Sequence, residues 1–217
     1  MLKGCSGIIM RATCTSCFIC LGFIFSSCLQ SVNLASTAYY QASTRHHELA
    51  DSKTMVSDDE WRSLIEEFER VIAANPQGEW ADDSQFAISS CWIWLSQDGD
   101  LEAIQHAVDS LKQMLGTYPH SPLLAESHYW LAHCYVRRDD APLAIAHYQE
   151  VIIDYYDSAS AKRAQLALAH IYEKQNHPSA AVALYQAIVN WNPDSRLAVQ
   201  AVERLDVLQA AELSRVV

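Results

Sequence analysis

The sequence predicts an all-α protein that folds as a right-handed α-solenoid of about four antiparallel helix pairs. The segment that begins at Tyr118, YPHSPLLAESHYWLAHCYV, repeats as YYDSASAKRAQLALAHIYE from Tyr155, a shift of 37 residues. Within both segments apolar residues recur every three or four positions, which is the pattern of one face of a helix. Half of the 217 residues are apolar, and only 6 are Gly and 6 are Pro. The chain therefore has enough apolar surface to bury a core along such an array.

The first 27 residues predict a lipoprotein-type signal peptide. Lys3 and Arg11 are the only charges before Cys28, and the run from Ala12 to Cys28 is uncharged. A membrane-spanning helix needs about 20 strongly apolar residues, whereas this run is shorter and contains several Ser and Thr, so a secretory signal explains it better. Three closely spaced cysteines of the run would leave with the signal, and these are Cys14, Cys17 and Cys20.

Cys28 adds a second indication. The four residues from Phe25 to Cys28, FSSC, resemble the lipobox of bacterial lipoproteins, in which the cysteine is lipidated and becomes the mature N-terminus, although that family usually has Leu where Phe25 stands. The resemblance implies lipidation of Cys28, and ordinary signal cleavage is the alternative. Met1 and Met10 both fit as the start of translation.

Residues 28–56 are predicted to be the lipidated cysteine and a flexible tether. Residues 29–56 are polar, rich in Ser, Thr and Ala, and without helical periodicity. A flexible chain of this length has a root-mean-square span of about 30 Å, enough to hold a domain just clear of a membrane. His46 and His47 within it are predicted to be solvated.

Residues 57–217 are predicted to form the repeat domain, with eight helices in four pairs. Leu131, Ala132 and Tyr135 have counterparts 37 residues later in Leu168, Ala169 and Tyr172, and the preceding unit lies 43 residues earlier because the loop SQDGD lengthens it. The helices between these segments keep the register, with Ala107, Leu111 and Met114, then Ala144, Tyr148 and Val151, then Ala181, Tyr185 and Ile188.

Polar residues and prolines mark the turns between helices. Just after each turn stands a residue that can open the next helix, because a Ser oxygen accepts from the unpaired N–H groups of a first turn. Pro residues precede three of these positions, where the earlier helix should end. The four predicted N-caps are Gly78, Ser121, Ser158 and Ser195, and the prolines are Pro76, Pro119 and Pro193.

The motif Leu131-Ala132-x-x-Tyr135, followed by Ala144-x-x-x-Tyr148, resembles the tetratricopeptide repeat (TPR). Its period is three residues longer than the usual 34, and with Tyr-Pro-x-Ser between helices it resembles the repeats of bacterial envelope proteins, such as BamD-like outer-membrane lipoproteins and the C-terminal TPR domain of the CpoB/YbgF group. The resemblance implies an array whose concave surface holds an extended peptide or a helix of a protein partner.

In TPR proteins three positions of the first helix of each repeat line this groove. Carried over, the candidate partner-binding residues are Phe86, Ser90, Trp94, Tyr129, His133, Arg137, Leu166, His170 and Lys174. Aromatic side chains at three of these positions would act as anchors, and Arg137 and Lys174 would bind a carboxylate of the partner. The alternative is that some of the nine merely face solvent or are covered by the next repeat.

Cys91 and Cys134 occupy the same position in successive repeats, as expected of packing residues. Equivalent positions on neighbouring helices are about 8–10 Å apart, whereas a disulfide needs Cα atoms within about 7 Å. We therefore expect two buried, unpaired thiols.

Other classes of function are disfavoured. With 26 acidic and 15 basic residues the formal charge is −11, the wrong sign for nucleic acid. His133 and His170 are repeat-equivalent, and the sequence has no pair of His or carboxylates four apart with a third ligand nearby, so we predict no metal and no cofactor. Neither a Gly-rich phosphate loop nor a nucleophile elbow is present in the mature chain, so we predict no enzyme.

Together these features predict a non-catalytic protein–protein interaction adaptor of the bacterial cell envelope. We expect it to be an outer-membrane lipoprotein that faces the periplasm, in outer-membrane protein assembly or in Tol–Pal and division coordination; a soluble periplasmic protein is the alternative. The alternative function is a structural spacer or an assembly-platform subunit of secretion, pilus or cell-wall machinery.

Overall fold

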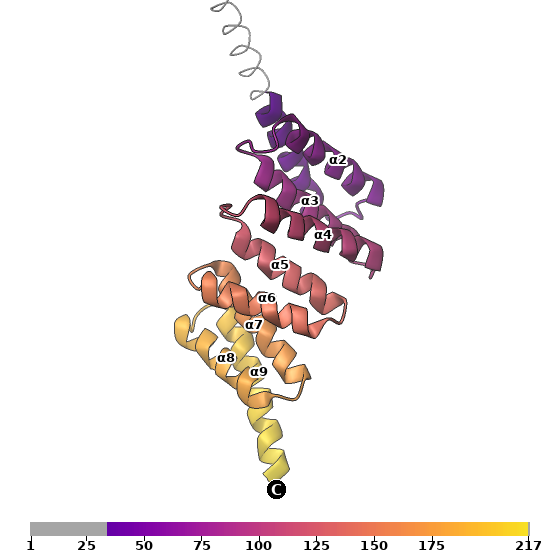
Figure 1. The fold of residues 1–217 in the computed structure, drawn as a ribbon. Coiled ribbons are helices and arrows are strands. Elements are labelled where there is room, and N and C mark those ends of the chain that lie inside the picture. The colour runs from indigo at the N-terminus through magenta and orange to yellow at the C-terminus, as the bar shows by residue number, and fades with distance from the viewer. Residues whose placement is uncertain (1–33, 217) are drawn as a thin grey trace, which may run out of the picture.

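The computed structural model describes residues 34–216, and this part of the chain is an all-α repeat array, as the sequence predicts (Figure 1). The predicted signal peptide and Cys28 lie outside the described residues. After a helix over residues 34–50 the elements are α2 (Asp58–Ala74), α3 (Ala81–Leu95), α4 (Leu101–Thr117), α5 (Leu124–Arg137), α6 (Ala141–Asp154), α7 (Ala159–Lys174), α8 (Pro178–Trp191) and α9 (Arg196–Val216). None of the described helices is long and apolar enough to cross a membrane.

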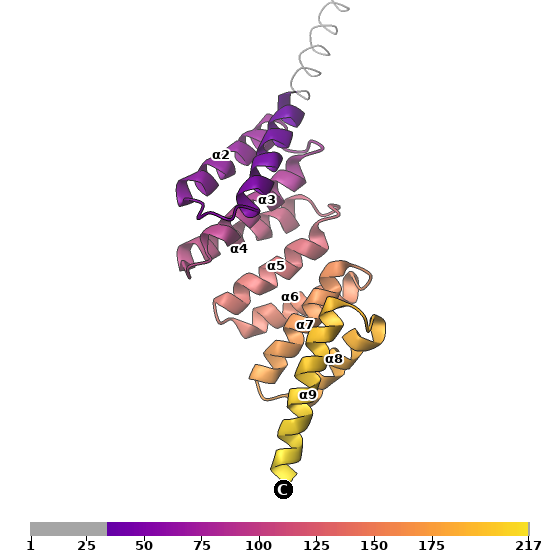
Figure 2. The ribbon, with the colours of Figure 1, turned by 180° about the vertical axis from the view of Figure 1, so that it is seen from behind.

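Each helix packs antiparallel on the one before it, so the array grows in one direction from α2 to α9 (Figures 1 and 2). Alternate helices also meet toward the C-terminal end, where α5 packs on α7 and α7 on α9. The end of α9 extends beyond the other helices (Figure 1). This arrangement confirms the predicted stack of helix pairs.

The core follows the 37-residue register of the sequence. The three repeat-equivalent alanines Ala107, Ala144 and Ala181 are completely buried, which lets neighbouring helices approach closely. Leu131 is also buried, and complete burial of a leucine side chain stabilises the fold by about 1.5–3 kcal/mol. The largest cluster of buried side chains runs from α4 through α7, with a smaller one at each end of the described array.

Two turns repeat with the same backbone geometry. Asp139, after α5, and Asn176, after α7, have φ of 59° and 58°, a left-handed conformation that Asp and Asn tolerate better than most residues. The next residue closes the turn in each case, because the N–H of Asp140 donates to the carbonyl of Tyr135 at 2.9 Å and that of His177 to Tyr172 at 2.8 Å. These two helices end in the same way because the repeat places the same kind of residue there.

Only two of the four predicted N-caps are confirmed. Ser158 and Ser195 accept hydrogen bonds from the backbone N–H groups of Ala161 and Ala198. The prediction was wrong for Gly78 and Ser121, because a short turn intervenes and α3 and α5 begin three residues later, at Ala81 and Leu124. The oxygen of Ser121 instead accepts from the N–H of Leu123, inside that turn.

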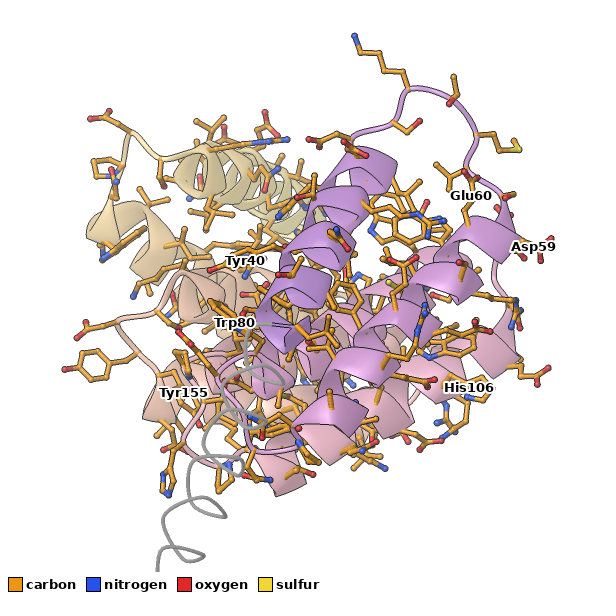
Figure 3. The ribbon with its side chains drawn as sticks, turned by 90° about the horizontal axis from the view of Figure 1, so that it is seen from above. Tyr40, Asp59, Glu60, Trp80, His106 and Tyr155 are labelled. Atoms are coloured by element: carbon orange, nitrogen blue, oxygen red, sulfur yellow. The ribbon has the colours of Figure 1, made fainter. Side chains whose placement is uncertain are left out.

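The predicted flexible tether was also wrong for residues 34–50, which form a helix that we call the N-terminal helix. It packs on α2 and α3. Ala42 is completely buried in the smaller core cluster at the N-terminal end of the described array, which we call the first core cluster. The ring of Tyr39 stacks on Trp80 with centroids 4.6 Å apart, and Tyr40 lies beside the same indole (Figure 3). Arg45 forms an ion pair with Glu67 of α2. The described array therefore begins before the predicted boundary at residue 57.

Candidate functional site

A cavity of about 530 Å³ lies between α3 and α5. It brings together five of the nine predicted groove residues, and these are Phe86, Ser90 and Trp94 of α3 and His133 and Arg137 of α5. Three further residues line the cavity that the sequence did not predict, and these are Ile93, Gln97 and Trp130. The site is therefore aromatic on both walls, with a cation at one end.

Arg137 connects the two walls of the cavity. Its Nη1 donates to Ser96 Oγ at 2.5 Å and its Nη2 donates to the Ser96 carbonyl. Ser96 is the C-cap of α3, where a cation interacts favourably with the helix dipole. Arg137 is thus a tie between α3 and α5 as well as a groove residue. A guanidinium has five N–H donors, so it can make these bonds and still offer others to a ligand.

His133 adds a polar ring to the lining of the cavity. Its Nδ1 is buried and has no partner among the described residues. Burial, and secondarily the charge of Arg137, lowers the pKa of His133 below its ordinary value, so the imidazole is neutral at pH 7. The edge of the ring meets Trp130, with centroids 5.3 Å apart.

The N-terminal helix and α2 contact two of the residues that line the cavity. The indole of Trp94 stacks on Trp61 with centroids 5.4 Å apart and the rings nearly parallel. His46 Nε2 lies 3.1 Å from Ser90 Oγ, so Ser90 already has a partner within the chain. The prediction that His46 is solvated was wrong, because this side chain is half-buried and its burial lowers its pKa.

The other four candidates do not line this cavity. Tyr129 packs against the core and against Arg163, whose guanidinium carbon lies 4.5 Å from the centre of the ring. Leu166 is a core residue, 9% exposed in the cluster that α9 covers, so its assignment to the groove was wrong. His170 and Lys174 are exposed on α7.

Cys91 and Cys134 are both buried and unpaired, as predicted. Burial raises the pKa of each thiol to about 12. Since the thiolate is the reactive form, both side chains are inert in the folded protein. They act as packing residues.

A second cluster of polar side chains, which the sequence did not predict, lies between α5 and α6. His128 of α5 meets His147 and Glu150 of α6. The two Nδ1 atoms and Glu150 Oε2 lie 3.1–3.5 Å from one another. Burial lowers the pKa of both histidines, while the charge of Glu150 opposes this. The sequence prediction considered ligands four residues apart, whereas His147 and Glu150 are three apart on α6, and His128 comes from the neighbouring helix α5. The His147-x-x-Glu150 spacing was the available signal.

Comparison with known proteins agrees with this geometry. The family model described as tetratricopeptide repeat matches residues 162–195, which contain most of α7 and α8. The chain folds as a TPR-like repeat array. TPR-like repeats of a Podosopora anserina kinesin light chain superpose with a TM-score of 0.60 at 16% identity, over 85% of this chain and 89% of that one.

A tetratricopeptide repeat protein from Parabacteroides merdae superposes equally well, with a TM-score of 0.60 at 12% identity. That match covers 81% of this chain and 61% of the other. A comparison with curated protein sequences gives no match. At such low identity the two structures support the TPR-like fold and not a particular function.

Proposed function

We propose that this TPR-like protein is a non-catalytic interaction scaffold that holds a segment of a partner protein in the cavity between α3 and α5. The observation that supports this is the composition of that cavity, where the aromatic side chains of Phe86, Trp94 and Trp130 surround about 530 Å³ next to Arg137. Aromatic and arginine side chains contribute most to binding energy at protein interfaces. Helical repeats present such surfaces to extended peptides or helices.

The chemistry of the walls defines the segment that fits. An apolar side chain of the partner would lie among the aromatic rings, and an acidic side chain or a backbone carbonyl would accept from Arg137. The protein as a whole has a formal charge of −11, but Arg137 gives the cavity a local positive charge. The cavity therefore favours an acidic segment of a partner.

Substitutions at the mouth of the cavity test this proposal. Gln97→Glu places a carboxylate on an exposed lining residue close to Arg137, so it should compete with an acidic partner without disturbing the core. Phe86→Ala removes an apolar contact. The chain is used as bait in solubilised envelope, and captured proteins are quantified by mass spectrometry.

The matched control is Gln175→Glu, the same change at the exposed C-cap of α7. We expect a protein that the parent chain and Gln175→Glu capture but that both cavity variants lose. Capture that is equal in all four chains contradicts the proposal. Thermal melts of each variant show whether a loss reflects unfolding.

We further propose that the protein acts in the bacterial cell envelope, as an outer-membrane lipoprotein attached through Cys28, in outer-membrane protein assembly or in Tol–Pal and division coordination. The FSSC sequence at Phe25–Cys28 supports this proposal. Mass spectrometry of the protein from membranes should find a lipidated N-terminal Cys28. An unmodified N-terminus at another residue would contradict the anchor and leave a soluble periplasmic protein.

An alternative function is a self-associating spacer or an assembly-platform subunit of secretion, pilus or cell-wall machinery. One observation favours it, since the last helix leaves apolar side chains open. Val199, Val202 and Val207 of α9 are 53%, 42% and 51% exposed. An end of a repeat array with an open apolar face can take another copy. Light scattering after size exclusion separates the two functions, because a concentration-dependent oligomer that Val199→Lys abolishes would support the spacer.

A further inference from the structure

Three metal-binding side chains meet where α5 packs on α6. The Nδ1 atoms of His128 and His147 are 3.1 Å apart. Glu150 Oε2 lies 3.2 Å from His128 Nδ1 and 3.5 Å from His147 Nδ1. His147 and Glu150 are three residues apart on α6, so they share a face of that helix. The three donor atoms form a nearly equilateral triangle.

The size of this triangle matches one face of a zinc tetrahedron. Zinc binds imidazole nitrogen at about 2.0–2.1 Å and carboxylate oxygen at about 2.0–2.2 Å, so two ligands at tetrahedral angles are about 3.3 Å apart. The distances of 3.1, 3.2 and 3.5 Å lie on both sides of that value. An ion just outside the plane of the triangle can therefore reach all three atoms without a rearrangement of either helix.

Neighbouring rings hold the two histidines in place. Tyr135 stacks parallel on His147, with centroids 5.7 Å apart and an angle of 2°. The ring of Tyr155 lies 6.2 Å from that of His128. His128 is buried at 8% exposure, whereas the side chain of Glu150 is 42% exposed. Solvent thus reaches the cluster from the side of Glu150, where a water can complete the coordination.

Without a metal, hydrogen bonds alone cannot make all three contacts among His128, His147 and Glu150 favourable. If each Nδ1 carries a proton and donates to Glu150, the two N–H groups face one another across 3.1 Å. If one histidine instead donates to the other, the accepting Nδ1 faces the ionised carboxylate with a lone pair, 3.2 or 3.5 Å away. Either way one contact is repulsive, whereas a cation makes all three attractive.

We propose that His128, His147 and Glu150 form a Zn²⁺ site, with each imidazole bound through Nδ1, the carboxylate through one oxygen, and water as the fourth ligand. Two imidazoles and a carboxylate suit zinc, whereas Mg²⁺ and Ca²⁺ prefer oxygen ligands. The ion would join the two helices of one repeat. This site stands independently of the proposed partner groove.

Zinc titration of the full chain after EDTA treatment tests the site. We expect one calorimetric binding event that His147→Ala and Glu150→Gln each weaken by about tenfold or more, since each removes a ligand. Both residues belong to the less buried side of the cluster, so their replacement should leave the fold intact, which circular dichroism checks. His120→Ala is the matched control, because His120 is exposed and lies outside the cluster.

Cobalt provides a second readout that distinguishes this site from thiolates elsewhere in the sequence. Bound tetrahedrally by nitrogen and oxygen, Co²⁺ should give visible absorption without the near-ultraviolet bands of sulfur ligation, and His147→Ala should remove it. Zinc affinity and cobalt spectra that are unchanged in both variants would overturn the proposal. A parent chain that binds no more zinc than a variant with both His147→Ala and Glu150→Gln would also overturn it.

Discussion

Replacing Arg137 by Met should separate the structural role of this residue from its role in the groove. Methionine keeps most of the side-chain length and its apolar contacts but removes the guanidinium, and with it both hydrogen bonds to Ser96. Ser96 is 1% exposed, so water cannot replace the lost donors without a rearrangement. The change therefore tests the tie between α3 and α5 directly.

The expected loss of stability is about 1.5 kcal/mol. Hydrogen bonds from a charged donor contribute about 1.5–3 kcal/mol net. The low end applies here because both acceptors keep other bonds: the Ser96 carbonyl accepts from Gly99 N–H at 3.0 Å, and Ser96 Oγ donates to the Ile93 carbonyl at 2.7 Å. Arg137 is also partly exposed. For a domain of this size the melting temperature should fall by about 3–6 °C.

Urea unfolding followed by circular dichroism measures this loss. Arg138→Met is the matched control, because it removes the same charge from an exposed neighbour that bonds only to Gln105 among the described residues, and it should change stability by less than about 0.5 kcal/mol. Arg137→Lys should recover less than half of the loss, since an ammonium cannot make both bonds. If Arg137→Met is as stable as the control, the tie does not exist and Arg137 is free to bind a partner.

Three further predictions concern other parts of the chain. Cys91 and Cys134 should not react with a thiol reagent at pH 8 in the native protein and should react fully after unfolding in urea without reductant, because burial raises both pKa values to about 12. Deleting the N-terminal helix (34–50) should lower the melting temperature, since it uncovers the first core cluster; an unchanged melt would support the flexible tether instead. The pKa of Glu173 is lowered, first by its hydrogen bond from Arg204, below its ordinary 4.5. This contribution to stability is present above pH 4.5 and is lost as the pH falls through the folded pKa, so Glu173→Gln should flatten the acid side of a stability profile.

The repeat array could be predicted because its signal is redundant. The same residue types return after 37 residues on both helices of a pair, as Ala144 and Ala181 show, and both are completely buried. A single substitution cannot hide such a register. The N-terminal helix lacks this redundancy. Its inward face consists of residues spaced four and three apart, and these are Ala35, Tyr39, Ala42, His46 and Leu49. Most of them are small or partly polar, whereas the inward faces of the later helices contain larger aliphatic residues, so the pattern is weaker.

The candidate groove could be predicted only in part, because equivalent positions have different neighbours. Leu166 belongs to the last complete pair, so α9 packs over it, whereas the corresponding residue Tyr129 packs on Arg163. His133 lines a cavity and His170, 37 residues later, is exposed. The sequence register identifies which face of a helix points inward, but the packing of neighbouring helices decides where space remains, as it does between α3 and α5.

The position of α5 connects the groove with the proposed zinc site. With 3.6 residues per turn, Arg137 lies about 180° around this helix from His128. Arg137 ties one face of α5 to α3, and His128 meets α6 on the opposite face. The two contacts therefore hold the same helix from both sides, and α5 also carries Trp130 and His133 into the cavity. Because the contacts share no residues and lie on opposite faces of α5, their losses in stability should add.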